Sequence, residues 1–148
     1  MEYTKRLMSL KKYSEMVGLK IIYDDSYDLE EFLKRIADNP VEPYRCFECY
    51  TMRLNRAAQR AAENGFKEFT TTLTVSIYQD HNLIRDIGEE VAKKHRVSFV
   101  YFDFRDGYRQ GHNKAREMGL YMQQYCGCVY SERDRFIDMK PEKIVRKY

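Results

Sequence analysis

Five segments of the chain are predicted to form helices, and apolar residues recur at helical spacing in two of them, residues 2–17 and 80–95. In the first segment Leu7, Leu10 and Val17 share one face, and Gly18 follows as a residue that readily ends a helix. The second segment follows Asp28, a residue type that caps helix N-termini. The five predicted helices span residues 2–17, 29–37, 46–64, 80–95 and 108–124.

Three shorter segments between these helices contain the β-branched and aromatic residues that favour strands. The predicted strands span residues 19–23, 67–73 and 97–103. Helices that alternate with strands indicate an α/β fold, in which helices flank a parallel sheet. Three parallel strands leave both outer strands as edges, so the sheet is thin and we expect part of it to be missing ahead of the first helix.

The composition indicates one globular domain over residues 1–148, with a basic tail over residues 139–148. Hydrophobic residues make up 43% and charged residues 33% of the chain, a balance that supports an apolar core. No apolar run approaches the roughly 18 residues of a membrane helix, and the charged N-terminus lacks a signal core. We therefore expect a cytoplasmic protein without a membrane segment.

The net charge of +3 is too small to predict nucleic-acid binding by itself. The thirteen tyrosines are more informative because several adjoin basic residues, as in Tyr44-Arg45 and Tyr108-Arg109. Such pairs suit stacking on unpaired bases and binding of phosphates. Half-buried tyrosines explain the same composition, so both interpretations stay open.

The four cysteines form two closely spaced pairs. Cys46 and Cys49 have C-x₂-C spacing at the start of a predicted helix, and Cys126 and Cys128 flank Gly127. Each short spacing directs two sulfurs to one point, and a chain without a secretory signal is unsuited to a disulfide scaffold. The spacing leaves three interpretations open: a four-cysteine zinc site, an iron–sulfur cluster and a thiol redox site.

Three motifs in order, "RCFECYTMRL", "FTTTLTVSIY" and "QQYCGCVYS", resemble the non-cobalamin epoxyqueuosine reductases of the QueH family. The opening "EYTKRLMSLKKYSEMVGL" is also similar to that family, so the resemblance runs from about residue 2 to residue 131. It implies an α/β fold related to the nucleotide α-hydrolases. It also implies reduction of epoxyqueuosine to queuosine at the wobble position of tRNA, the last step of queuosine biosynthesis.

The resemblance further implies a [4Fe–4S] cluster and a nearby mononuclear metal ion, which we expect to be iron. The implied ligands of this metal centre are Cys46, Cys49, Cys126 and Cys128. The expected partners are the tRNA anticodon loop and an external electron donor. The two candidates for the general acid that protonates the epoxide oxygen are Tyr125 and a metal-bound water.

The matched motifs also contain polar residues that suit a substrate pocket. These are Arg45, Thr71, Thr72, Ser76, Tyr78 and Gln124. Structural roles remain open for several of them: the threonines are also typical strand residues, and Arg45 can pair with Glu42 or Glu48. The three histidines, His81, His95 and His112, lie outside the motifs and are expected at the surface.

Basic residues outside the motifs are candidate tRNA contacts, although solvated helix faces explain them equally well. They are Arg105, Arg109, Lys114, Arg116, Lys143, Arg146 and Lys147. The sequence departs from the family pattern at Ile77, Gln79 and Met122, where proline, lysine and arginine are usual. The last two departures each remove a positive charge from a region expected to meet RNA.

Members of the family begin with a strand that ends in adjacent cysteines, and this sequence starts at the helix that follows. Loss of that strand would remove metal ligands and weaken the sheet. Two alternatives to an active reductase therefore follow: an inactive truncated fragment of the enzyme, or a zinc-stabilised RNA-binding module that uses the same four cysteines structurally.

Overall fold

The computed structural model describes residues 2–24 and 26–137, which divide into two compact units. Unit 1 combines the N-terminal residues up to Asp24 with the residues from Gln110 onward, and unit 2 runs from Asp25 to Arg109. The basic tail over residues 139–148 lies outside the described residues. The single-domain organisation stays a prediction.

Unit 2 contains three α-helices, two 3₁₀ turns and two short strands that are parallel to each other. Its elements are α2 (Leu29–Arg35), α3 (Tyr44–Glu63), β1 (Glu68–Phe69), η1 (Thr72–Val75), α4 (His81–His95), β2 (Ser98–Phe99) and η2 (Arg105–Gly107). Glu68 is opposite Ser98 and Phe69 is opposite Phe99. Helix α4 connects the two strands, which makes β1-α4-β2 a crossover unit of the kind that parallel strands require.

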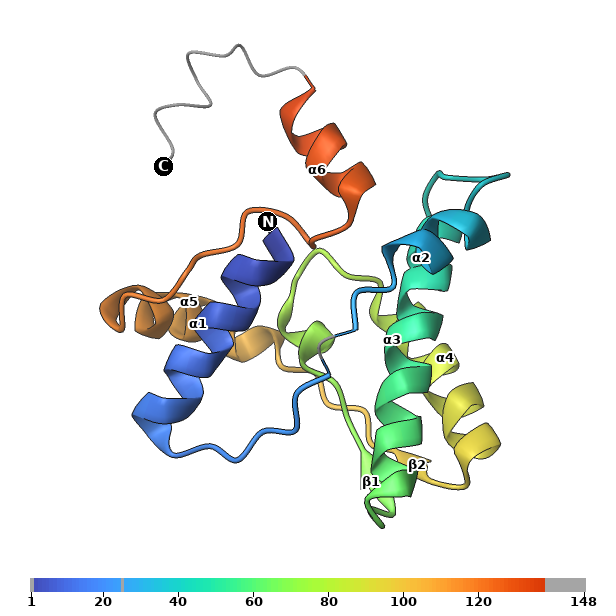
Figure 1. Cartoon of the computed structure of the whole chain (residues 1–148), viewed down its shortest axis with the longest axis horizontal. Helices are drawn as coiled ribbons and strands as arrows, with labels where there is room; N and C mark the ends of the chain where they lie inside the picture. Colours follow the sequence, from blue (N-terminus) through green and yellow to red (C-terminus); the bar gives the residue numbers. More distant parts are fainter. Residues whose placement is uncertain (1, 25, 138–148) are drawn as a thin grey trace. The chain divides into compact units, whose positions relative to one another are not determined.

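The apolar core of unit 2 lies between α3 and α4, which run side by side (Figure 1). The buried core residues are Tyr50, Leu54 and Ala58 of α3 with Ile84, Ile87 and Val91 of α4. The rings of Phe69 and Phe99, one from each strand, pack with centroids 5.1 Å apart and contact this cluster. The helical spacing of apolar residues therefore places the two helices against the strands.

Helix α4 has two well-defined ends. The side chain of Asp80 accepts a hydrogen bond from the Leu83 amide at 3.0 Å, which caps the N-terminus. At the C-terminus, Arg96 adopts a left-handed backbone with φ +58°. Both ends lie within one residue of the predicted helix.

Gly88 permits the close approach of α4 to β2. A Cβ atom at this position would lie 2.4 Å from Cδ1 of the Phe99 ring, well inside van der Waals contact. The missing side chain therefore allows the Phe99 ring to pack directly on the α4 backbone.

Unit 1 contains α1 (Glu2–Val17), most of α5 (Tyr108–Glu117) and α6 (Val129–Phe136). The segment after α5 lies along α1 and is held to it by hydrogen bonds. Lys12 Nζ donates to the Gly119 carbonyl at 3.0 Å, and the Tyr121 amide donates to Ser9 Oγ at 3.2 Å. The Tyr121 hydroxyl donates to Glu2 at 2.7 Å. These contacts join α1 to the segment after α5 within this unit.

The structure confirms an α/β fold with a small parallel sheet and flanking helices, but it corrects several boundaries. The predicted strand over 19–23 is wrong, because this segment has no regular secondary structure and leaves Leu19 and Ile22 51% and 67% exposed. Strands predicted over 67–73 and 97–103 are only two residues long. The helix predicted over 108–124 ends at Glu117, before Gly119 with φ +61°.

Within residues 2–24 and 26–137, no helix combines the length and the apolar character that crossing a membrane requires.

Gly88→Ala is expected to lower the free energy of unfolding by about 1–3 kcal/mol, because the new methyl group overpacks the Phe99 ring. Urea denaturation followed by circular dichroism measures this change. The matched control is Gly111→Ala in α5, where a Cβ meets nothing within 4 Å. That substitution should raise stability by up to about 1 kcal/mol. Equal stability of Gly88→Ala and the wild type would contradict the close approach of α4 and β2.

Candidate functional site

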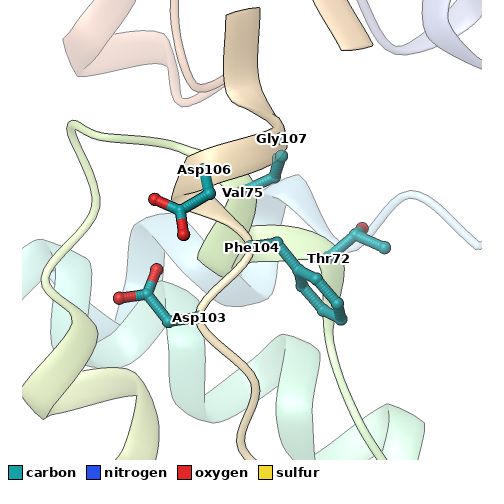
Figure 2. A pocket seen from close by; sticks show the side chains of 6 residues that line it. All are labelled: Thr72, Val75, Asp103, Phe104, Asp106 and Gly107. Carbon is teal, nitrogen blue, oxygen red and sulfur yellow. The ribbon is translucent and has the colours of Figure 1, made fainter. Parts of the chain in front are cut away.

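The first candidate region is the edge of unit 2 at which both parallel strands end. Open α/β sheets bind ligands outside the carboxyl ends of their strands. Here η1 follows β1, η2 follows β2, and the two 3₁₀ turns pack against each other. An open depression of about 580 Å³ lies between them, lined by Thr72, Val75, Asp103, Phe104, Asp106 and Gly107 (Figure 2). In this view the Asp103 and Asp106 carboxyl groups extend to one side of the η2 backbone and the Phe104 ring to the other.

The start of α3 lies at this same edge of unit 2, because the chain reverses direction between α3 and β1 (Figure 1). The contact is direct: the Tyr50 hydroxyl donates to Gln79 Oε1 at 2.7 Å and accepts from the Asp80 amide at 3.4 Å. Gln79 thus serves as the acceptor for a buried phenol.

Cys46 and Cys49 lie on the first two turns of α3, just before Tyr50. They are three residues apart on the helix, so their side chains share a face, and both are half-buried. The helix N-terminus carries a partial positive charge, which favours thiolates. This pair therefore presents two soft donors at the ligand-binding edge of unit 2.

The polar residues of the "TTTLTVS" segment mainly form hydrogen bonds within the loop after β1. Thr71 Oγ1 accepts from the Leu73 amide at 3.2 Å, and buried Thr74 donates to the Thr71 carbonyl at 3.1 Å. Ser76 Oγ accepts from the Tyr78 amide at 3.2 Å. Thr71 thus caps η1 and does not lie in a strand. Among the predicted pocket residues of this loop, Thr72 lines the depression and Tyr78 is 80% exposed.

Arg45 forms an ion pair with Glu42, one of the two carboxylates that the sequence left open as its partner. Its side chain is 8% exposed, and its guanidinium donates to Glu42 at 2.5 Å and to the Pro40 carbonyl at 3.5 Å. The other carboxylate considered, Glu48, pairs with Arg35 at 3.4 Å. Arg45 therefore braces the loop that leads into α3.

His81 is nearly buried, so the prediction that it lies at the surface is wrong. Its side chain is only 10% exposed, with Nε2 3.2 Å from the Ser76 carbonyl and Nδ1 3.0 Å from the Tyr101 hydroxyl. Since a carbonyl only accepts, Nε2 carries a proton and, in the neutral ring, Nδ1 accepts from Tyr101. His81 thus connects the loop after β1 to the segment after β2. Its position three residues after the end of the "FTTTLTVSIY" motif is the available sequence signal.

Asp103 and Arg105 form an ion pair at the rim of the depression. Arg105 Nη2 lies 2.5 Å from Asp103 Oδ2, and Arg105 Nε lies 2.9 Å from Oδ1. The side-chain hydrogen bond from Arg105, followed by its backbone amide, lowers the pKa of Asp103 to about 2. Arg105, a candidate tRNA contact, is therefore already paired with a carboxylate.

The second candidate region is the Cys126–Cys128 loop in unit 1. Gly127 has φ +97°, a backbone that favours glycine, and Cys128 is the N-cap residue of α6. The Cys126 thiol donates to Ser131 Oγ at 3.0 Å, and Ser131 Oγ donates to the Cys128 carbonyl at 2.8 Å. Both cysteines are half-buried. The loop therefore places a second thiol pair at a helix start.

Tyr125 and Gln124 precede this loop. Burial is the main cause that raises the pKa of Tyr125 above its usual range, followed by a hydrogen bond with Glu132. The Tyr125 ring also packs edge-on against Phe136, with centroids 6.0 Å apart. Gln124 Oε1 is buried and has no hydrogen-bond partner within the described part of the chain.

The donor chemistry fits a soft metal centre, but each unit supplies only one pair of thiols. None of the four cysteines forms a disulfide bond within the described residues. Across residues 2–24 and 26–137, no group of three or more histidines, cysteines, aspartates or glutamates is placed to hold a metal ion. The assignment of the cysteines as ligands stays a prediction.

A parallel βαβ unit with thiols at its ligand-binding edge defines an α/β protein with a candidate metal site. The profile of the family described as epoxyqueuosine reductase QueH matches residues 1–134. The chain therefore belongs to the epoxyqueuosine reductase QueH family.

Three relatives show the extent of the similarity, and each bears the name epoxyqueuosine reductase QueH. The protein of Dehalococcoides mccartyi is 38% identical over 92% of this chain and 74% of its own length. The protein of Thermotoga maritima is 34% identical over 90% of this chain and 73% of its own length. For the Helicobacter pylori protein the identity is 36%, over 88% of this chain but 38% of the relative.

The Asp103 carboxyl group is expected to titrate near pH 2 in the folded protein, below its ordinary value of 3.8. The lowered pKa means that the ion pair stabilises the fold above pH 3.8 and that this contribution is lost as the pH falls through about 2. Carboxyl NMR titration measures this value. Arg105→Gln should move the Asp103 pKa back toward 3.8. An unchanged pKa in that variant would contradict Arg105 as the cause.

Proposed function

We propose that this chain reduces epoxyqueuosine to queuosine at the wobble position of tRNA, the last step of queuosine biosynthesis. The observation that carries the proposal is the family match, which covers residues 1–134 and contains both cysteine pairs. The named relatives are epoxyqueuosine reductases. The chain is accordingly an oxidoreductase that acts on tRNA in the cytoplasm.

Conversion of the epoxide to an alkene removes the oxygen as water and consumes two electrons and two protons. The electrons come from an external donor. When bound, a [4Fe–4S] cluster supplies single-electron transfer and an adjacent iron ion supplies Lewis-acid polarisation of the oxygen. Cys46, Cys49, Cys126 and Cys128 are the residues that would hold them.

Tyr125 is the proposed proton donor. Its phenol is protonated at neutral pH and can therefore donate to an oxygen that gains negative charge. Burial against Phe136 restricts the ring, and the hydrogen bond with Glu132 orients the hydroxyl. Gln124, with its unsatisfied carbonyl oxygen, is a second polar group available to the substrate.

The substrate-binding role of unit 2 rests on its exposed residues at the strand ends. Thr72 offers a hydroxyl at the depression, and Tyr78 is exposed enough to stack on an unpaired base of the anticodon loop. Thr71 and Ser76 support this surface through contacts within the loop after β1, and Arg45 braces the separate loop that leads into α3. In unit 1, exposed Lys114 pairs with exposed Glu117 at 3.3 Å, and such a weak pair can be exchanged for a phosphate.

Cys126→Ser and Cys46→Ser are each expected to lose most of the iron that the wild type binds, because a serine hydroxyl is a poor ligand for iron in a cluster. Anaerobic purification followed by iron and acid-labile sulfide analysis measures this loss. A colourless wild-type protein that contains zinc and no sulfide would contradict the reductase and support a zinc-stabilised RNA-binding module. Unchanged iron in one variant would remove that cysteine from the ligand set.

Tyr125→Phe is expected to lower turnover of epoxyqueuosine-containing tRNA by roughly 10²–10⁴-fold, the usual contribution of a general acid. Dithionite serves as the reductant, and the iron content should match that of the wild type. The matched control is Tyr130→Phe in α6, which should retain turnover. Equal activity of both variants would assign proton donation to another group.

A further inference from the structure

One arginine of α1 contacts the backbone immediately before and within the Cys126–Cys128 loop. Arg6 Nη2 donates to the Tyr125 carbonyl at 2.6 Å, and Arg6 Nη1 donates to the Cys126 carbonyl at 2.8 Å. These partners are 119 and 120 residues away in sequence. The planar guanidinium presents two donors in a fixed geometry, which suits two successive carbonyls better than a lysine amine does.

Gly127 makes room for this contact. A Cβ atom at residue 127 would lie only 2.4 Å from Arg6 Nη1 and 2.9 Å from Arg6 Cζ. The glycine therefore has two functions: it adopts φ +97°, and it leaves the space that the guanidinium occupies.

Arg6 is itself held in place by its surroundings. Its Nε donates to Glu2 Oε1 at 2.9 Å, while Glu2 Oε2 accepts from the Tyr121 hydroxyl at 2.7 Å. The guanidinium also lies over the Tyr125 ring, 5.9 Å from its centroid. The side chains of Arg6 and Glu2 are only 25% and 14% exposed, which limits the screening of this ion pair by water.

The two carbonyls belong to the two peptide groups on either side of the Cys126 Cα atom. Each peptide group is planar, so holding both planes restricts φ and ψ of Cys126 and thereby the direction of its Cα–Cβ bond. We infer that Arg6 is a positioning residue that orients the Cys126 thiol as a metal ligand. The inference rests on the proposed function, since that function makes Cys126 a ligand.

The test compares Arg6→Lys and Arg6→Met with the matched control Lys12→Met. Lys12 lies on the same helix and also donates to a backbone carbonyl, that of Gly119 at 3.0 Å, but away from the cysteines. In the metal-free chain, hydrogen–deuterium exchange of residues 121–131 is expected to quicken in both Arg6 variants and not in Lys12→Met. This measurement does not depend on metal binding.

After anaerobic loading, both Arg6 variants are expected to bind iron about tenfold more weakly, the usual effect of losing a residue that orients a ligand. The electron paramagnetic resonance spectrum of the iron that Arg6→Lys retains should differ from that of the wild type, since lysine keeps the charge but not the two-carbonyl geometry. Lys12→Met should match the wild type in iron affinity and spectrum.

Wild-type exchange rates and a wild-type spectrum in Arg6→Lys would overturn the inference. Failure of the wild type to bind iron would instead refute the proposed function, and the exchange rates would still decide whether Arg6 orders the loop. If Arg6→Met fails to fold, Arg6→Lys alone decides, because it keeps the charge and most of the side chain.

Discussion

The packing of α3 on α4 is the constraint on which unit 2 depends. The two helices bury one shared cluster, which includes Leu54 and Ile84, and the strands contribute Phe69 and Phe99 to it. Gly88 lets the Phe99 ring approach the α4 backbone, so β2 lies close enough to pair with β1. Because parallel strands end at one edge, this packing places η1, η2 and the start of α3 there.

The two cysteine pairs are presented by different local structures. Cys46 and Cys49 rely on the regular turn of α3, which holds their side chains on one face, and Cys46 also packs against the apolar cluster. Cys126 and Cys128 lie in an irregular loop, where Gly127 has a left-handed backbone and Arg6 holds the carbonyls of two successive peptide groups. A loop without a repeating hydrogen-bond pattern needs such tertiary contacts before it can direct a ligand.

Many polar residues of the family motifs stabilise the chain itself. Thr71 caps η1, Ser76 closes a turn, and Arg45 pairs with Glu42, although their types alone are equally compatible with binding a substrate. His81 is the opposite case, because it lies outside the motifs and yet joins the loops that follow both strands. Residue type and motif membership therefore predict which segments form the site better than they predict the role of each side chain.

The sequence by itself determined five of the six α-helices in the described residues, the fold class, the family and the two thiol pairs, because these depend on local spacing and on short motifs. Helix α6 (Val129–Phe136) was not predicted. Helix α4 is the clearest case, since its apolar stripe and the Asp80 cap lie within a few residues of each other. Only the tertiary structure decided that residues 19–23 form no strand, that His81 is nearly buried, and that Arg6 holds the Cys126 backbone. Each of these features depends on residues far away in sequence. A strand forms only where a neighbouring strand can pair with it, and Arg6 donates to carbonyls 119 and 120 residues away. Propensity and periodicity describe residues that are close in sequence, so they do not identify partners that only the folded chain brings together.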